Sequence, residues 1–136
     1  MLGRLEHDED RNTYSGEISS RQQKVMIHLK PDERGDFARA EERAIRFARD
    51  SRLELESITR YLAGHFLDMA NEDWADPQRD ALNVATFIER LRVDTVAFGG
   101  DGGVTYHFTA GDIFGDHGLI ARMRHDGILF DAELAG

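Results

Sequence analysis

The sequence predicts a two-layer α+β domain, in which an antiparallel sheet of about five to seven strands has its helices on one face. Residues 93–136 contain four strand-like runs separated by turn residues. Residues 36–71 instead repeat apolar side chains at helical spacing, and residues 1–30 contain two or three shorter strand-like runs. The apolar face of the sheet and the apolar faces of the helices must both be buried, and they can be buried against each other. These patterns therefore predict one packed unit spanning residues 1–136, without a parallel crossover.

The N-terminal strands are expected at residues 2–6, 13–19 and 25–29, with polar turn-forming residues between them. Gly16 indicates a bulge or an edge in the second strand. The third strand, VMIHL, is apolar at nearly every position, which predicts a central strand or one covered on both sides. Pro31 follows it and has no amide proton to continue the ladder.

The helical region consists of two apolar stripes that are out of phase across residues 49–52. A single helix over residues 36–71 would be about 54 Å long, more than the diameter of a domain of this size. We therefore expect two helices or one kinked helix, with Asp36 as the N-cap and Asp50 or Ser51 at the break. Residues 71–83 then form a loop in which Trp74 fills the sheet–helix junction, and a short helix follows at residues 86–91.

The last hairpin has the clearest turn. Asp126 and Gly127 favour a two-residue type I′ turn, which would place His125 opposite Ile128. The same register pairs apolar residues on one face and charged residues on the other. It sets these pairs opposite each other: Met123 with Phe130, Arg122 with Asp131, Ala121 with Ala132, and Leu119 with Leu134.

The glycine-rich segment GGDGG joins two further strands of this region. If all five residues form the loop, Phe98 pairs with Val104, Val96 with Tyr106, and Asp94 with Phe108, so that the aromatic residues share a face. A phosphate-binding loop would need a following helix and a Lys-Ser or Lys-Thr pair, whereas a strand follows here.

Composition limits the function. The chain has 26 acidic and 17 basic residues and a net charge of -9, which disfavours nucleic acid and anionic membranes and suits a basic partner protein. The simpler interpretation, which we favour, is that the charge serves solubility alone. There is no cysteine, no apolar run of membrane-spanning length and no signal peptide, so we expect a cytoplasmic protein without cofactors. The oligomeric state stays open.

The candidate site is the loop of residues 110–119, AGDIFGDHGL. Asp112, Asp116 and His117 could bind a metal, with His65 nearby if the helix packs against the loop. The simpler interpretation is structural: Asp112 and His117 bond to backbone groups, and no metal binds. Phe114 is then tucked under the helices, although an exposed Phe114 would instead mark a partner site.

Other catalytic patterns are weaker. No serine stands in a nucleophile-elbow sequence. Glu54 and Glu56 are expected on a solvated helix face, and His107 on the exposed polar side of its strand. His28, in an apolar strand, is expected to be a hydrogen-bonded structural residue.

The chain resembles the bacterial family of unknown function numbered 2262 over nearly its whole length. The resemblance rests on a Gly-containing second strand (YSGEI), an FIERL-like helix, and a loop that in the family runs Asp, apolar, Phe, Trp, Gly, His. Here that loop is Asp112 to His117, with Gly115 and Asp116 where the family has Trp and Gly. The resemblance implies an α+β domain of uncharacterised activity, with members similar to immunity or accessory proteins rather than enzymes.

Two functional hypotheses follow. The first is a non-enzymatic, immunity-like domain that binds a basic partner protein, with Asp112, Phe114, Asp116 and His117 as binding residues. The alternative is a small metal-dependent hydrolase that uses Asp112, Asp116 and His117.

Overall fold

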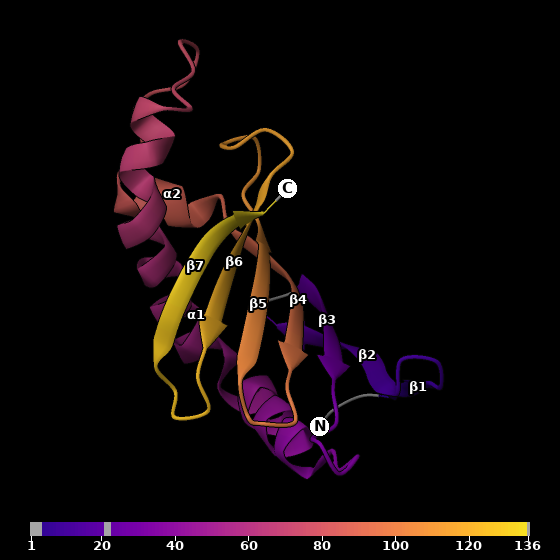
Figure 1. Ribbon diagram of the computed structural model, residues 1–136. Helices are drawn as coiled ribbons and strands as arrows, with labels where there is room; N and C mark the ends of the chain where they lie inside the picture. Colours follow the sequence, from indigo (N-terminus) through magenta and orange to yellow (C-terminus); the bar gives the residue numbers. More distant parts are fainter. Residues whose placement is uncertain (1–3, 21–22, 136) are drawn as a thin grey trace.

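A computed structural model describes residues 4–20 and 23–135 as a seven-stranded sheet with a long helix across one face (Figure 1). The strands lie in the sheet in chain order, from the short edge strand β1 to the edge strand β7. The elements are β1 (Glu6–Asp8), β2 (Thr13–Ser20), β3 (Gln23–Leu29), α1 (Ala38–Glu72), α2 (Val84–Glu89), β4 (Arg92–Phe98), β5 (Val104–Thr109), β6 (Gly118–Met123) and β7 (Leu129–Ala135). The α+β class is therefore confirmed. None of the described helices has the length and apolar composition needed to cross a bilayer.

The sheet is mixed, because β3 and β4 pair in parallel, with Ile27 opposite Val96. The prediction of a wholly antiparallel sheet without a parallel crossover is wrong at this pair. The chain leaves the end of β3, crosses the sheet through α1 and α2, and returns to begin β4 in the same direction. A parallel neighbour requires such a long crossover, and the helical region supplies it.

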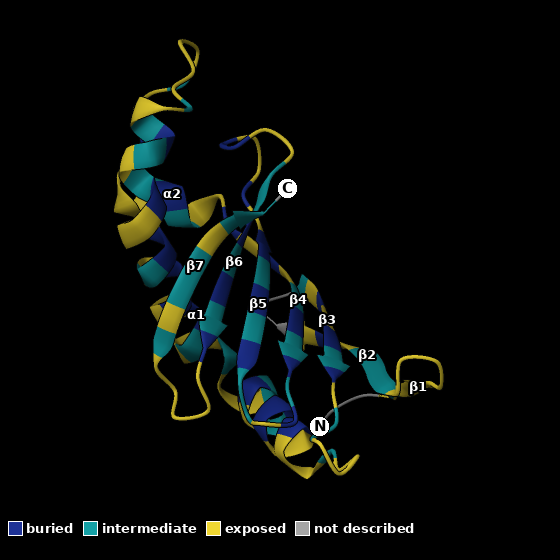
Figure 2. Ribbon diagram, in the orientation of Figure 1, coloured by how far each residue is buried: buried dark blue, intermediate teal, exposed yellow. Residues whose placement is uncertain are grey.

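One face of the sheet packs on α1 and the other is uncovered (Figure 2). In β3, Val25, Ile27 and Leu29 are buried, whereas Met26 and His28 lie on the uncovered face. The strand is central, as one of the two predicted alternatives had it, since it lies between β2 and β4. It is covered on one side only, so VMIHL is an alternating strand despite its apolar composition.

Helix α1 is kinked, as predicted, and the kink lies at Asp50, whose φ of -114° and ψ of 22° are not helical. The N-terminal half lies beneath the sheet, and the C-terminal half extends past the end of the sheet (Figure 1). The N-cap is Phe37 rather than Asp36. The Asp36 carboxylate nevertheless accepts a hydrogen bond of 2.8 Å from the Ala38 amide. Helix α2 begins earlier than expected, because Asn83 caps it.

The β6–β7 turn differs from the prediction. Only Gly127 has a positive φ, of 86°, and its amide donates to the Arg124 carbonyl, so the loop has three residues and is not a type I′ turn. Met123 pairs with Leu129, not with Phe130, and Arg124 lies where His125 was expected, bonded to Ile128. A bulge at Phe130 then compensates for the extra loop residue. The predicted pairs from Arg122–Asp131 to Leu119–Leu134 are confirmed.

In the β4–β5 pair, the predicted Phe98–Val104 and Val96–Tyr106 partners are confirmed. Phe108 instead faces Val93, because a bulge displaces Asp94 from the ladder. Asp94 is exposed there, whereas Phe108 stays in the core.

The first strand lies later than predicted, at Glu6–Asp8; of the predicted range 2–6, residues 2 and 3 lie outside the described residues. Gly16 is not at a bulge, since it pairs regularly with Ile27. A Cβ at this position would lie 2.8 Å from the Arg4 carbonyl oxygen, so the close approach of the N-terminal segment explains the glycine.

Candidate functional site

The loop between β5 and β6 folds back into the core through its aromatic residue. Phe114 is completely buried, and its ring makes edge-to-face contacts with Trp74 at 5.8 Å, Phe66 at 6.1 Å and Phe87 at 6.3 Å. These rings come from α1, the segment after α1, and α2. Phe114 therefore joins the sheet to both helices, and the predictions for Phe114 and Trp74 at this junction are confirmed.

The polar residues of the loop have separate partners. His117 Nδ1 bonds to the Ala135 carbonyl at 3.2 Å, which confirms a backbone contact for His117. Asp112 does not bond to backbone amides as expected. Its carboxylate accepts from Arg90 Nη1 at 2.7 Å, because Arg90 follows α2 directly and reaches across the loop. Asp116 is exposed.

The alternative metal site is not assembled. Asp112 and His117 are occupied by different neighbours, and His65 Nδ1 bonds to the Tyr61 carbonyl within its own helix at 3.1 Å. Across the part of the chain that the structure describes, no three His, Asp or Glu side chains are arranged to hold a metal ion. The metal-dependent hydrolase thus has no ligand set in this loop.

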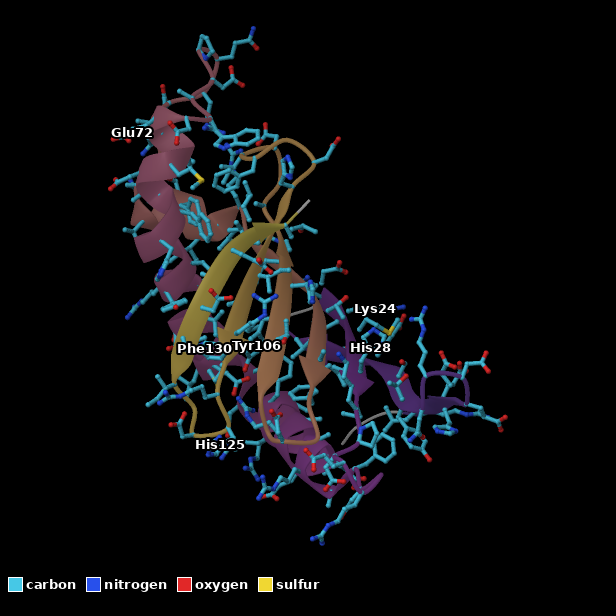
Figure 3. The ribbon with its side chains drawn as sticks, in the orientation of Figure 1. Lys24, His28, Glu72, Tyr106, His125 and Phe130 are labelled. Carbon is cyan, nitrogen blue, oxygen red and sulfur yellow. The ribbon has the colours of Figure 1, made fainter. Side chains whose placement is uncertain are left out.

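Around this loop, the end of the molecule is strongly acidic. The end of α1 and the following segment present five exposed carboxylates: Asp68, Glu72, Asp73, Asp76 and Asp80. Trp74 connects this segment to the β5–β6 loop, which adds the exposed Asp112 and Asp116 (Figure 3 labels Glu72 in this region). We call these seven residues the acidic end.

Basic side chains at the acidic end are already engaged. Arg79 donates to the carbonyls of Ala70 and Trp74, at 3.3 and 3.1 Å. Arg90 forms the ion pair with Asp112 described above. The negative charge of the acidic end is therefore only partly neutralised within the described residues, and Coulomb attraction would favour a cationic ligand there.

A buried polar network beneath the sheet was not predicted. Arg43 is 7% exposed, and its Nη2 donates to Glu54 and, at 3.1 Å, to the Tyr106 hydroxyl, which itself donates to Glu54 at 2.9 Å. Burial and then the Glu54 carboxylate raise the pKa of Tyr106 far above its ordinary value. Glu54 was expected on a solvated face, and that prediction is wrong.

A signal for this network was present in the sequence. Arg43 lies between Ala40, Ala44 and Phe47 in the i, i+3, i+4, i+7 pattern of a buried stripe. An arginine inside such a stripe requires a buried acceptor, and Glu54, beyond the kink at Asp50, provides it.

The uncovered sheet face has a hollow of about 630 Å³ beside two histidines. Ser15 Oγ and His28 Nδ1 lie 2.7 Å apart, which confirms the structural role expected of His28. No described residue orients the other ring nitrogen of His28, so the pair lacks the third member that a nucleophilic triad needs.

His107, on the neighbouring strand β5, lines the same hollow and is half-buried rather than exposed as expected. Burial, then the Arg122 guanidinium, lowers the pKa of His107 below 6.5, and Asp94 acts in the opposite direction.

Comparison with known proteins places the chain in a family without a characterised activity. A family model described as an uncharacterized protein conserved in bacteria (DUF2262) matches residues 1–134. No protein with a curated description matches the chain, and no solved structure matches it.

Proposed function

Since the chain belongs to the bacterial family DUF2262, whose activity is uncharacterised, we propose its function from its geometry: it is a non-enzymatic domain that binds a basic partner protein through the acidic end. The observation that supports this most directly is the seven exposed carboxylates gathered on two adjacent segments, of which Asp112 is paired with Arg90, while Arg79 bonds to backbone carbonyls instead. The most specific version of this proposal is that the partner is a basic toxin, which this domain holds as an immunity protein.

The rigidity of the acidic end suits such a role. Phe114 anchors the β5–β6 loop among three aromatic rings, and Asn71 fixes the segment after α1 by two hydrogen bonds of 2.8 Å to the backbone of Leu82. Carboxylates on an anchored frame lose less conformational freedom on binding than carboxylates on a loose tail. Complementary charge would mainly speed the encounter with the partner and select its sign.

The test begins with tagged protein from the native host, whose bound protein is identified and then titrated in purified form. One variant neutralises five residues of the acidic end: Asp68→Asn, Glu72→Gln, Asp73→Asn, Asp76→Asn and Asp80→Asn. A control variant neutralises five exposed acidic residues elsewhere: Glu9→Gln, Asp10→Asn, Glu17→Gln, Glu33→Gln and Glu56→Gln. Both change the net charge equally.

We expect the association rate to fall about tenfold or more in the first variant and to change much less in the control, with the difference shrinking as salt is added. Equal losses in both variants would mean that net charge alone governs binding, and no loss in either would place the partner on another surface. A toxin-like gene directly upstream would support the immunity role.

A further inference from the structure

At the opposite end of the sheet, three arginines lie on one face of α1. Arg39, Arg43 and Arg46 are spaced by four and three residues, so their side chains project from successive turns on the same side. They face the β4–β5 loop and the β6–β7 hairpin, where His125 lies (Figure 3). Together these residues surround a hollow of about 250 Å³, which we call the arginine hollow.

Several side chains of the arginine hollow have hydrogen-bond donors that are not used within the described structure. Arg43 Nη1 is buried without a hydrogen-bond partner among the described residues. A buried guanidinium nitrogen in this state is rare in native proteins and costs free energy. Within residues 4–20 and 23–135, Arg39 donates only to the Asp101 carbonyl, at 3.4 Å. Arg46 and His125 are exposed, and neither side chain has a hydrogen bond or ion pair with a described residue.

Three carboxylates lie beside the three arginines of the hollow: Asp101, Glu42 and Glu54. Asp101 Oδ1 accepts from the Gly103 amide at 2.8 Å, which fixes the loop. Glu42 is exposed and forms no ion pair with Arg39 or Arg46 in the described structure, although it stands three and four residues from them. Glu54 compensates the charge of Arg43 alone. The hollow therefore has no excess of positive formal charge, and what it offers an anion is guanidinium donors that the Glu42 and Asp101 carboxylates do not occupy.

We propose that the arginine hollow binds a phosphate group, either as inorganic phosphate or as the end of a small phosphate monoester. Its volume is below the roughly 300–1,000 Å³ of sites for drug-sized ligands, so it suits a small anion. Arginine forks match phosphate oxygens in pairs. A tetrahedral phosphate also presents oxygens in several directions, toward a helix on one side and His125 on the other, whereas a carboxylate presents two oxygens in one plane.

The test is calorimetric titration of the purified protein with inorganic phosphate, phenyl phosphate and malonate, at constant ionic strength set with chloride. The variants are Arg39→Gln and Arg46→Gln, both exposed positions in α1, so that the fold is retained. The control is Arg60→Gln, an exposed arginine in the C-terminal half of the same helix. Thermal melts without ligand verify that all variants are folded.

We expect one phosphate per chain, with Kd rising about tenfold or more in Arg39→Gln and Arg46→Gln and unchanged in Arg60→Gln, as loss of a charge-assisted hydrogen bond implies. Tighter binding of inorganic phosphate than of phenyl phosphate identifies the free ion as the ligand, and the reverse order identifies a monoester. Three outcomes overturn the proposal: no binding, an equal loss in all three variants, or malonate binding as tightly as phosphate.

Discussion

The two ends of the sheet differ in charge and in how their connections are held. At one end, the β5–β6 loop is polar in sequence but is anchored by the fully buried Phe114, and its surface is acidic. At the other end, the β6–β7 hairpin alternates regularly in sequence, yet Phe130 is 54% exposed and the nearby helix is rich in arginine. This contrast shows that an apolar residue in a loop can belong to the core, whereas an apolar residue in a strand can remain on the surface.

Figure 1 shows how α1 connects these two ends. Its N-terminal half lies beside the hairpin end, and its C-terminal half reaches the acidic end. Residues 38–49 contain four arginines and two glutamates, whereas residues 51–72 contain two arginines and four acidic residues. The helix thus changes from net positive to net negative charge across the kink at Asp50.

Replacing Phe114 and Phe130, one at a time, with alanine should give the largest difference in unfolding free energy between the two ends. Phe114→Ala should cost about 3–5 kcal/mol of unfolding free energy, because it removes a ring packed among three others. Phe130→Ala should change the stability by less than about 0.5 kcal/mol, since its side chain is mostly exposed. Urea denaturation of both variants measures the difference, and equal losses would break the contrast between the two ends.

The buried network near the hairpin end should give the next largest effect. Glu54→Gln leaves the Arg43 guanidinium without a charged acceptor and should cost roughly 1.5–3 kcal/mol. Glu56→Gln, on the exposed side of the same helix, is the matched control and should stay within about 0.5 kcal/mol. A Glu54→Gln variant as stable as the parent in urea would show that the pair contributes nothing to folding.

The ion pair at the acidic end should matter less. Arg90 and Asp112 form a contact of 2.7 Å, with side chains 40% and 75% exposed. A double-mutant cycle of Arg90→Gln and Asp112→Asn should give a coupling free energy of about 0.2–1 kcal/mol that decreases with salt. A larger, salt-independent coupling would mean that the loop depends on this pair as well as on Phe114.

The smallest effect on the unfolding free energy is expected for His107, which lies midway between the two ends. Because its pKa is lowered in the folded state, the folded protein prefers the neutral ring. Its contribution to stability is present above pH 6.5, the ordinary pKa of histidine, and is lost as the pH falls through the lowered value. His107→Gln should therefore flatten the fall in unfolding free energy below pH 6.5, measured by denaturation at several pH values. An unchanged slope would show that the ring is not desolvated by folding.

Part of the candidate site was predictable because it depends on local chemistry. An aromatic residue in a loop of Asp and Gly is either buried in the core or exposed to a partner, and Phe114 is buried as expected. His117 could reach a neighbouring backbone carbonyl, and it does. Asp112 could not be assigned correctly, since Arg90 is distant in the sequence and becomes its neighbour only when α2 packs beside the loop.

Periodicity in the sequence predicted the helices and strands of this protein and most of the register in its β4–β5 and β6–β7 hairpins. The change from helical to alternating periodicity located α1 and the C-terminal strands, and the phase shift near Asp50 located the kink. The register from Arg122–Asp131 outward followed from the alternation of apolar and charged residues. These features depend on neighbours along the chain or across one hairpin, where the period of the side chains acts directly.

The parallel pairing of β3 with β4, the bulge at Asp94 and the partner of Arg43 instead follow from contacts between segments that are distant in the sequence. Each of these features depends on how the crossover through α1 and α2 packs on the sheet. A parallel pair has no local pattern of its own, because its two strands are joined by a long crossover and not by a turn. Arg43 illustrates the same cause: its cost of burial is offset by Glu54 and Tyr106, which only the folded chain brings to it.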